Sequence, residues 1–102
     1  MILYHPAARR EYDRQIAVLM RNPFTTRVVS NFIEEIESAE KAIHDDPRRF
    51  PVVCGENQYR RFGPTKIYRF ILIYETMGKD IHIIALVHPS RRPRYWIKRR
   101  IL

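Results

Sequence analysis

Residues 67–88 read IYRFILIYETMGKDIHIIALVH, and this stretch predicts the centre of the fold. Two runs rich in isoleucine, leucine and tyrosine flank the segment MGKD at 77–80, whose glycine tolerates the positive φ of a tight hairpin turn. We therefore expect a long strand over residues 67–75 and a partner strand over residues 81–87. Proline at 89 should stop the second strand, because it cannot donate a ladder hydrogen bond.

Two helices and a third strand are predicted upstream of this hairpin. Apolar residues recur at three- and four-residue spacing over residues 8–19 and again over 29–43, which indicates two helices with one buried face each. The first helix should begin at residues 6–7, and Pro47 should end the second, because the residue before a proline is driven out of the helical region. A short strand over residues 59–62 then leads into the hairpin.

Together these elements predict an α+β fold made by a single domain over residues 1–102. The expected order is a short N-terminal strand, a two-helix antiparallel hairpin, a three-stranded antiparallel meander and a short C-terminal helical segment from about Arg94. Residues 48–57 are expected to form a loop. The helices should cover one face of the sheet and leave the other face partly open.

Composition limits the classes of protein to which this fold can belong. The apolar fraction of 45% is typical of a folded chain, and no apolar run approaches the roughly 20 residues that cross a bilayer. Cys54 is the only cysteine, which excludes an intramolecular disulfide and a cysteine-based zinc site. Of the four histidines, His5, His44 and His82 form no ligand-like group with one another. A soluble cytoplasmic protein without metal or cofactor is therefore expected.

Positive charge is concentrated in the second half of the chain. Residues 1–47 hold six Lys and Arg against eight Asp and Glu, whereas residues 48–102 hold thirteen against three, for a net charge of +8. The acids of the second helix fall mostly off its apolar stripe, and Glu11 on the first helix is expected to be an ordinary surface charge. The basic half should attract a polyanion or an acidic protein partner.

The candidate site lies at the strand ends and in the ending HPSRRPRYW at 88–96. RNA cleavage through the 2′-hydroxyl needs a base, an acid and cations that hold the charge growing on phosphorus. An imidazole titrates near neutral pH, and guanidinium groups bind phosphate in bidentate fashion. The candidate catalytic residues of a nuclease are His88, Arg60, Arg61 and Arg92. The candidate target-binding residues are Arg60, Arg61, His88, Arg91, Arg92, Tyr95 and Trp96.

Each candidate also has a structural interpretation. His88 can cap a strand end, and the pair Arg60-Arg61 can protect a sheet edge from pairing with another chain. Tyr95 and Trp96 are more typical of core packing than of base stacking.

The order of these pieces resembles the RelE/ParE superfamily of toxins from bacterial toxin–antitoxin pairs, and the resemblance covers nearly the whole chain. It rests on HPAARREY at 5–12, FIEEIESAEKAI at 32–43, Pro47 with Phe50-Pro51, YRR at 59–61, YRFILIYE at 68–75, IHIIALVH at 81–88 and RRPRYW at 91–96. Each piece alone is weak. Their order and spacing together are specific.

Within that superfamily the chain is more similar to the ParE branch. Its C-terminal segment is similar to the usual C-terminal pattern of that branch, with His88, RRP at 91–93, YW at 95–96 and Arg99. The ribonuclease branch instead carries Tyr-Arg-x-x-Tyr, and alignment of its final tyrosine on Tyr74 puts Ile71 where that pattern has arginine. The neighbouring Arg69 does not replace it, because two residues along a strand span roughly 6 to 7 Å.

The resemblance implies a toxin of a plasmid stabilisation system that inhibits DNA gyrase without catalysis. It also implies a hetero-oligomer with a small cognate antitoxin. The basic half predicts that this antitoxin is acidic. Two alternatives stay open, namely a RelE-like mRNA interferase that acts on the ribosome and its mRNA, and a non-toxic basic module that binds nucleic acid.

Overall fold

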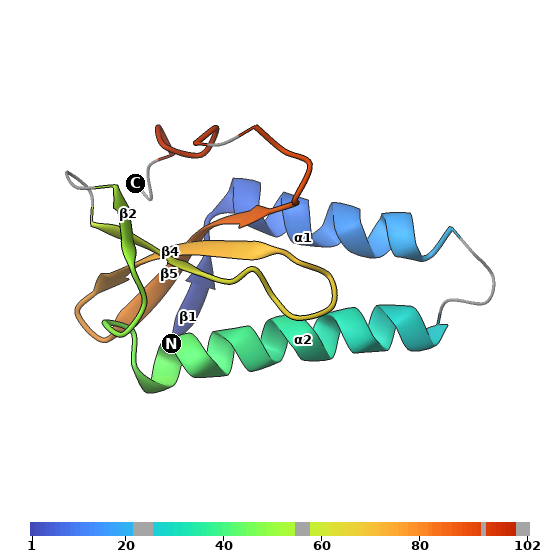
Figure 1. Ribbon diagram of the computed structural model, residues 1–102, viewed down its shortest axis with the longest axis horizontal. Helices are drawn as coiled ribbons and strands as arrows, with labels where there is room; N and C mark the ends of the chain where they lie inside the picture. The colour runs from blue at the N-terminus through green and yellow to red at the C-terminus, as the bar shows by residue number, and fades with distance from the viewer. Residues whose placement is uncertain (22–25, 55–57, 93, 100–102) are drawn as a thin grey trace.

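A mixed sheet of five strands is the centre of the computed structural model, which describes residues 1–21, 26–54, 58–92 and 94–99 (Figure 1). The spatial order of the strands is β1-β5-β4-β3-β2. Their bounds are β1 (Ile2–Tyr4), β2 (Val52–Cys54), β3 (Tyr59–Phe62), β4 (Ile71–Met77) and β5 (Asp80–Val87).

Two helices in the described part of the chain, α1 (Pro6–Leu19) and α2 (Thr26–Asp45), run in opposite directions (Figure 1). The backbone amide of Ala7 donates to Nδ1 of His5, which caps the start of α1, and α2 ends before Pro47 as the sequence predicts. Among the described residues, no helix is both long and apolar enough to cross a membrane.

The predicted three-stranded antiparallel meander with a C-terminal helix is wrong. β1 joins the sheet through parallel pairing with β5. β2 lies inside the segment predicted as a loop and pairs antiparallel with β3. Residues 94–98 form turns in place of a helix, with the amide of Ile97 donating to the carbonyl of Arg94 at 3.1 Å. Residues 55–57 of the predicted loop, Pro93 and Arg100 lie outside the described residues.

The strand predicted over residues 67–75 begins later, at Ile71, because residues 63–70 form a closed loop. Thr65 closes this loop from its buried position, since its amide donates to the carbonyl of Phe70 at 2.8 Å and its hydroxyl accepts from the amide of Phe70 at 3.1 Å. Arg69 takes φ +64°, which ends any extended run there.

The helices cover one face of the sheet through a single core cluster. Ala8 and Tyr12 of α1 and four residues of α2 at helical spacing, Phe32, Ile36, Ala39 and Ile43, are all buried. They pack on strand residues that include Leu72, Tyr74, Ile83 and Leu86. The ring of Phe32 lies 5.7 Å from that of Tyr12 and 5.5 Å from that of Phe70, which ties both helices to the sheet.

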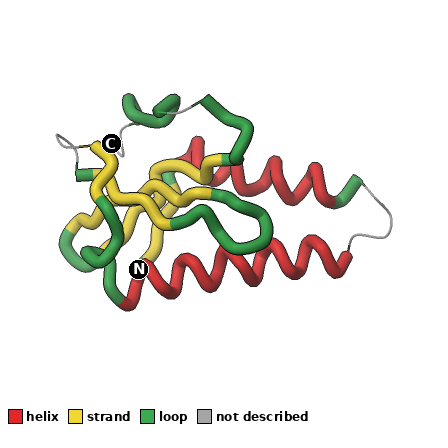
Figure 2. The backbone as a smooth tube through the Cα atoms, in the orientation of Figure 1, coloured by secondary structure: helices red, strands yellow, loops and turns green. Residues whose placement is uncertain are grey.

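The opposite face of the sheet, predicted to be partly open, carries the C-terminal segment 94–99 (Figure 2). Trp96 is 5% exposed and packs in one cluster with Tyr59, Ile73 and Ile84. β5 is therefore covered on both faces, which explains why five consecutive residues from Ile83 to Val87 are buried. The structural interpretation of Trp96 as a packing residue is confirmed.

Two glycines offer a test of the loop that precedes β4. We expect Gly63→Ala to lower the free energy of unfolding by about 3 kcal/mol, because φ is +113° and the new Cβ would lie 2.6 Å from the carbonyl oxygen of Phe70. The control Gly78→Ala should cost about 1 kcal/mol, because its φ is +62° and no atom lies within 4 Å of the added Cβ. Urea unfolding measures both, and equal losses would contradict the role given to the loop.

Candidate functional site

The arginine pair of β3 is divided between the two faces of the sheet. Adjacent residues of a strand point to opposite sides, so Arg60 and Arg61 cannot clamp one phosphate together. Arg60 lies toward the helices, where its Nη1 donates to the carbonyls of Arg48 at 3.1 Å and Phe50 at 2.6 Å. Its guanidinium therefore fixes the segment that follows α2.

Tyr74 holds the same segment from β4, since its hydroxyl donates to the carbonyl of Pro47 at 2.6 Å. Burial raises the pKa of Tyr74 to about 12, against the lowering effect of the Arg60 charge. The phenol therefore stays protonated and keeps this hydrogen bond throughout the physiological range.

Arg61 lies on the face that carries the C-terminal segment. It lines a cavity of about 280 Å³ together with Arg94, Trp96 and apolar residues of β2, β4 and β5. His88 is not among the residues that line this cavity. The predicted cation cluster is therefore split, with Arg60, Arg61 and His88 in three separate places.

His88, Arg91 and Tyr95 do come together, in a cavity of about 350 Å³ that we call the His88 cavity. Arg14 of α1 contributes a second guanidinium, and Phe70 and Leu86 add apolar surface. Arg92 is exposed and does not line the cavity, although it is the next residue to Arg91. Arg14 was not a predicted site residue, because nothing in the sequence relates α1 to residues 88–95.

The hydrogen bonds of His88 determine its chemistry. Its Nδ1 accepts from the backbone amide of Ser90 at 3.1 Å and lies 2.7 Å from the hydroxyl oxygen of Ser90. A backbone N–H can only donate, so this contact assigns Nδ1 as the acceptor and places the proton of the neutral ring on Nε2. In this state Nε2 is a hydrogen-bond donor, not a general base.

Glu11 organises the wall of the His88 cavity, and the prediction that it is an ordinary surface charge is wrong. Its side chain is 15% exposed and receives both Nη atoms of Arg99, at 2.8 and 3.0 Å. The hydroxyl of Tyr95 donates to the same carboxylate, and so does the backbone amide of Leu86 at 3.0 Å. Glu11 lies three residues after buried Ala8 and so on the same face of α1, and this spacing was the sequence signal that could have indicated its burial.

Tyr95 connects the Glu11 carboxylate to Arg91. Burial, followed by the hydrogen bond to Glu11, raises the pKa of Tyr95 well above its usual value, so the phenol stays protonated. The guanidinium carbon of Arg91 lies 4.2 Å from the centre of the Tyr95 ring, and that of Arg99 lies 5.1 Å from it. Arg91 is therefore oriented by a ring that is itself held in place.

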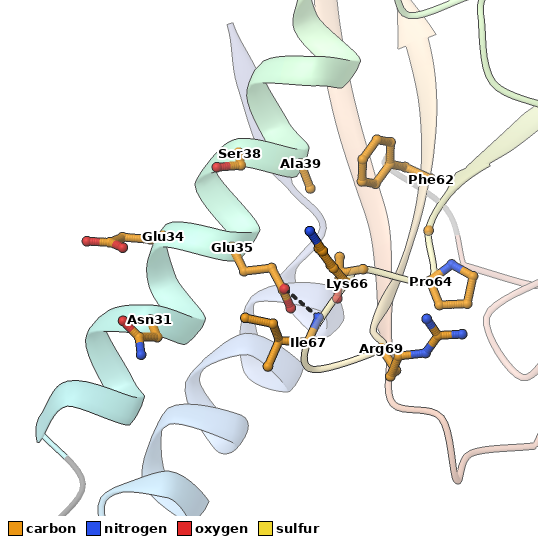
Figure 3. Close-up of a pocket in the computed structure, with 12 residues that line it drawn as sticks. Asn31, Glu34, Glu35, Ser38, Ala39, Phe62, Pro64, Lys66, Ile67 and Arg69 are labelled. Atoms are coloured by element: carbon orange, nitrogen blue, oxygen red, sulfur yellow. Dashed lines mark hydrogen bonds between the residues drawn. The ribbon is translucent and has the colours of Figure 1, made fainter.

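A larger cavity of about 900 Å³ lies between α2 and the loop 63–69 (Figure 3). Glu35 points across it to the loop, where its two carboxylate oxygens accept from the amides of Ile67 at 2.7 Å and Tyr68 at 2.8 Å. Burial alone would raise the pKa of Glu35, but these two hydrogen bonds and one from Thr65 give a pKa below the ordinary value. The carboxylate anchors the loop and is not available as an acid or base.

Across the described ranges, no three residues among His, Cys, Asp and Glu gather in a way that would hold a metal ion. The arrangement that stands out is one imidazole donor with two guanidinium groups, which is suited to binding an anion.

Replacement of Glu11 tests the carboxylate network. We expect Glu11→Gln to lower the free energy of unfolding by about 2 kcal/mol, because four charge-assisted hydrogen bonds weaken or are lost and Arg99 loses its counter-ion. Glu34→Gln, an exposed position on α2, is the control and should change stability by less than about 0.5 kcal/mol. Equal effects in chemical denaturation would show that Glu11 is an ordinary surface charge after all.

Glu35 gives a pH-dependent test. Its folded pKa lies below the ordinary value of 4.5, so its contribution to stability is present above about pH 4.5 and is lost as the pH falls through the folded pKa. We expect Glu35→Gln to cost on the order of 1 kcal/mol at pH 7. The difference from the wild-type chain should shrink as urea unfolding is repeated from pH 5 to pH 3, and a constant difference would contradict this.

Comparison with models of known protein families gives no match for this chain. A search of curated protein sequences likewise gives no significant match.

Proposed function

We propose that this chain is the toxin of a cytoplasmic toxin–antitoxin pair of the RelE/ParE type, and that it acts as a ParE-like inhibitor of DNA gyrase without catalysing a reaction. The observation that carries the proposal is the hydrogen bond from the amide of Ser90 to Nδ1 of His88. With Nδ1 assigned as the acceptor, the other ring nitrogen is a hydrogen-bond donor, which supports a binding role for His88.

The distribution of arginines supports the same proposal. A ribonuclease needs cations gathered around one phosphate, whereas Arg60 is used by two backbone carbonyls and Arg61 lies beside Arg94 in another cavity. Arg91 and Arg92 are exposed and lie three and four residues after His88, where a partner could contact them. Binding chemistry therefore fits the arrangement better than phosphoryl-transfer chemistry.

The same charge distribution bears on the proposed antitoxin. A small acidic partner would pair with exposed cations such as Arg91 and Arg92, and it would gain order on binding. Apolar residues of the sheet beneath segment 94–99 already pack against Trp96. We therefore expect the partner to bind over the basic C-terminal residues, not directly on that part of the sheet.

One observation favours a RelE-like endoribonuclease as the second candidate. His88, Arg91 and Arg14 share one cavity, so a phosphate could meet an imidazole and two guanidinium groups there. In that case loss of the imidazole should remove most of the rate, because general acid–base catalysis contributes roughly a hundredfold or more.

Purified protein distinguishes the two candidates. We expect it to inhibit supercoiling by gyrase while ribosome-bound mRNA stays intact, and expression of the chain alone should arrest bacterial growth. His88→Gln should weaken inhibition by less than about tenfold, because an amide still donates a hydrogen bond. Lys79→Gln, in the β4–β5 turn at the far end of the sheet, is the control and should inhibit as the wild type does.

Other outcomes select other functions. Cleaved mRNA with unimpaired gyrase, and loss of that cleavage in His88→Gln, would select the nuclease. Normal growth with folded protein in the cell would contradict both toxin functions and leave the basic nucleic-acid-binding module.

A further inference from the structure

The His88 cavity has the composition of a site for a phosphate group. Its polar wall carries the guanidinium groups of Arg14 and Arg91, and the Nε2–H of His88 has no hydrogen-bond partner among the described residues. These groups come from α1 and from the segment after β5, so they approach the cavity from two sides. Guanidinium and imidazole N–H groups are the donors that phosphate oxygens accept best.

Among the described residues that line this cavity, the one carboxylate is already neutralised. Glu11 receives two hydrogen bonds from Arg99, one from Tyr95 and one from the backbone of β5, so its charge is fully engaged inside the protein. Neither Arg14 nor Arg91 forms an ion pair with a carboxylate of the described residues. The cavity therefore presents uncompensated positive charge.

The site is also organised before a ligand arrives. Arg91 lies against the Tyr95 ring, Tyr95 is held by Glu11, and His88 is held by Ser90 and by an edge-to-face contact with Phe70 at 5.2 Å. Fixed donors lose less conformational entropy when they bind, which increases affinity. Apolar surface from Phe70 and Leu86 lowers the local dielectric and strengthens each charged contact.

Further cations extend beyond the cavity in two directions. Arg10 lies one helical turn before Arg14 on α1, and Arg92 follows Arg91, and all four side chains are exposed. A free nucleotide would contact only the cavity. A polymer with regularly spaced phosphates would contact the flanking arginines as well, so this distribution favours a nucleic acid.

The aromatic residues decide between single-stranded and double-stranded nucleic acid. Proteins that bind unpaired bases stack them on exposed aromatic rings. Here Trp96 is buried in the core, and the ring of Tyr95 is contacted by two guanidinium groups. Among the described residues that line the cavity, neither Tyr95 nor buried Phe70 offers a free ring for stacking, so contacts to the sugar-phosphate backbone of a duplex are favoured.

We infer that the His88 cavity binds a backbone phosphate of duplex DNA, with Arg14, His88 and Arg91 as its ligands and Arg10 and Arg92 on adjacent phosphates. The inference rests on the proposed function in one respect, since a chain bound to gyrase would lie beside duplex DNA. Its contacts are independent of base sequence, because they involve phosphates only.

Fluorescence anisotropy with a labelled duplex of about 20 base pairs tests this directly, at several salt concentrations and without gyrase. Arg14→Gln and Arg91→Gln should each weaken binding about fivefold to tenfold at low salt. Each should also lower the slope of log affinity against log salt by about one, because one phosphate contact is lost. Lys79→Gln removes the same charge at the far end of the sheet and should change affinity less than twofold.

The competitors identify the source of the phosphate. We expect unlabelled duplex to displace the probe well below the concentration at which ATP, single-stranded RNA or polyglutamate does so. Equal competition by ATP would contradict the inference that the ligand is a polymer. Equal competition by single-stranded RNA would contradict the preference for a duplex, and equal competition by polyglutamate would contradict the specificity for phosphate. If Arg14→Gln and Arg91→Gln bind the duplex as tightly as Lys79→Gln does, the proposed site is wrong.

The same variants separate this inference from the proposed function. Gyrase inhibition without duplex binding would leave the toxin proposal standing and remove the phosphate site. Duplex binding that depends on Arg14 and Arg91, without any effect on gyrase, would do the reverse.

Discussion

The Glu11 carboxylate is the contact on which three parts of this molecule depend. β1 ends at Tyr4, so the side of β5 beyond that point has no neighbouring strand to satisfy its backbone groups. Glu11 accepts the amide of Leu86, and Arg99 donates to the carbonyl of Ile84 at 2.9 Å. Two side chains that bind each other therefore continue the sheet where the strand stops. A helix, a strand edge and the C-terminal segment are fixed by one charge pair.

This arrangement separates the structural charges of the chain from those that can meet a ligand. Arg60 and Arg99 look the same in sequence as Arg91 and Arg92, but the first two donate to groups inside the protein and the last two are exposed. Net charge alone therefore overstates the number of cations that can contact a partner. The exposed arginines in and beside the His88 cavity, Arg10, Arg14, Arg91 and Arg92, come from α1 and from the residues that follow β5, so two separate segments supply the positive charge around this cavity.

Features with a local signal could be predicted from the sequence, and features that depend on distant partners could not. Helical spacing and proline gave the bounds of α1 and α2 closely, and glycine gave the β4–β5 turn. The parallel pairing of β1 with β5 joins residues almost eighty positions apart, and β2 is too short to show alternation. Sequence reasoning missed the roles of Glu11 and Arg14 for the same reason. Only tertiary contacts show that Glu11 is enclosed and that Arg14 lines the same cavity as His88.

The parallel pairing of β1 also sets the order in which the chain can fold during synthesis. β1 is made before both helices, but its partner residues Ile81 to Ile83 are made after them. The ion pair of Glu11 forms later still, because Arg99 follows β5 in the sequence. Until then α1 lacks both the β5 strand on which it packs and the counter-ion of Glu11, so these tertiary contacts form only after Arg99 has been synthesised. Contacts of such long sequence separation fold slowly, because loop closure costs entropy before they form.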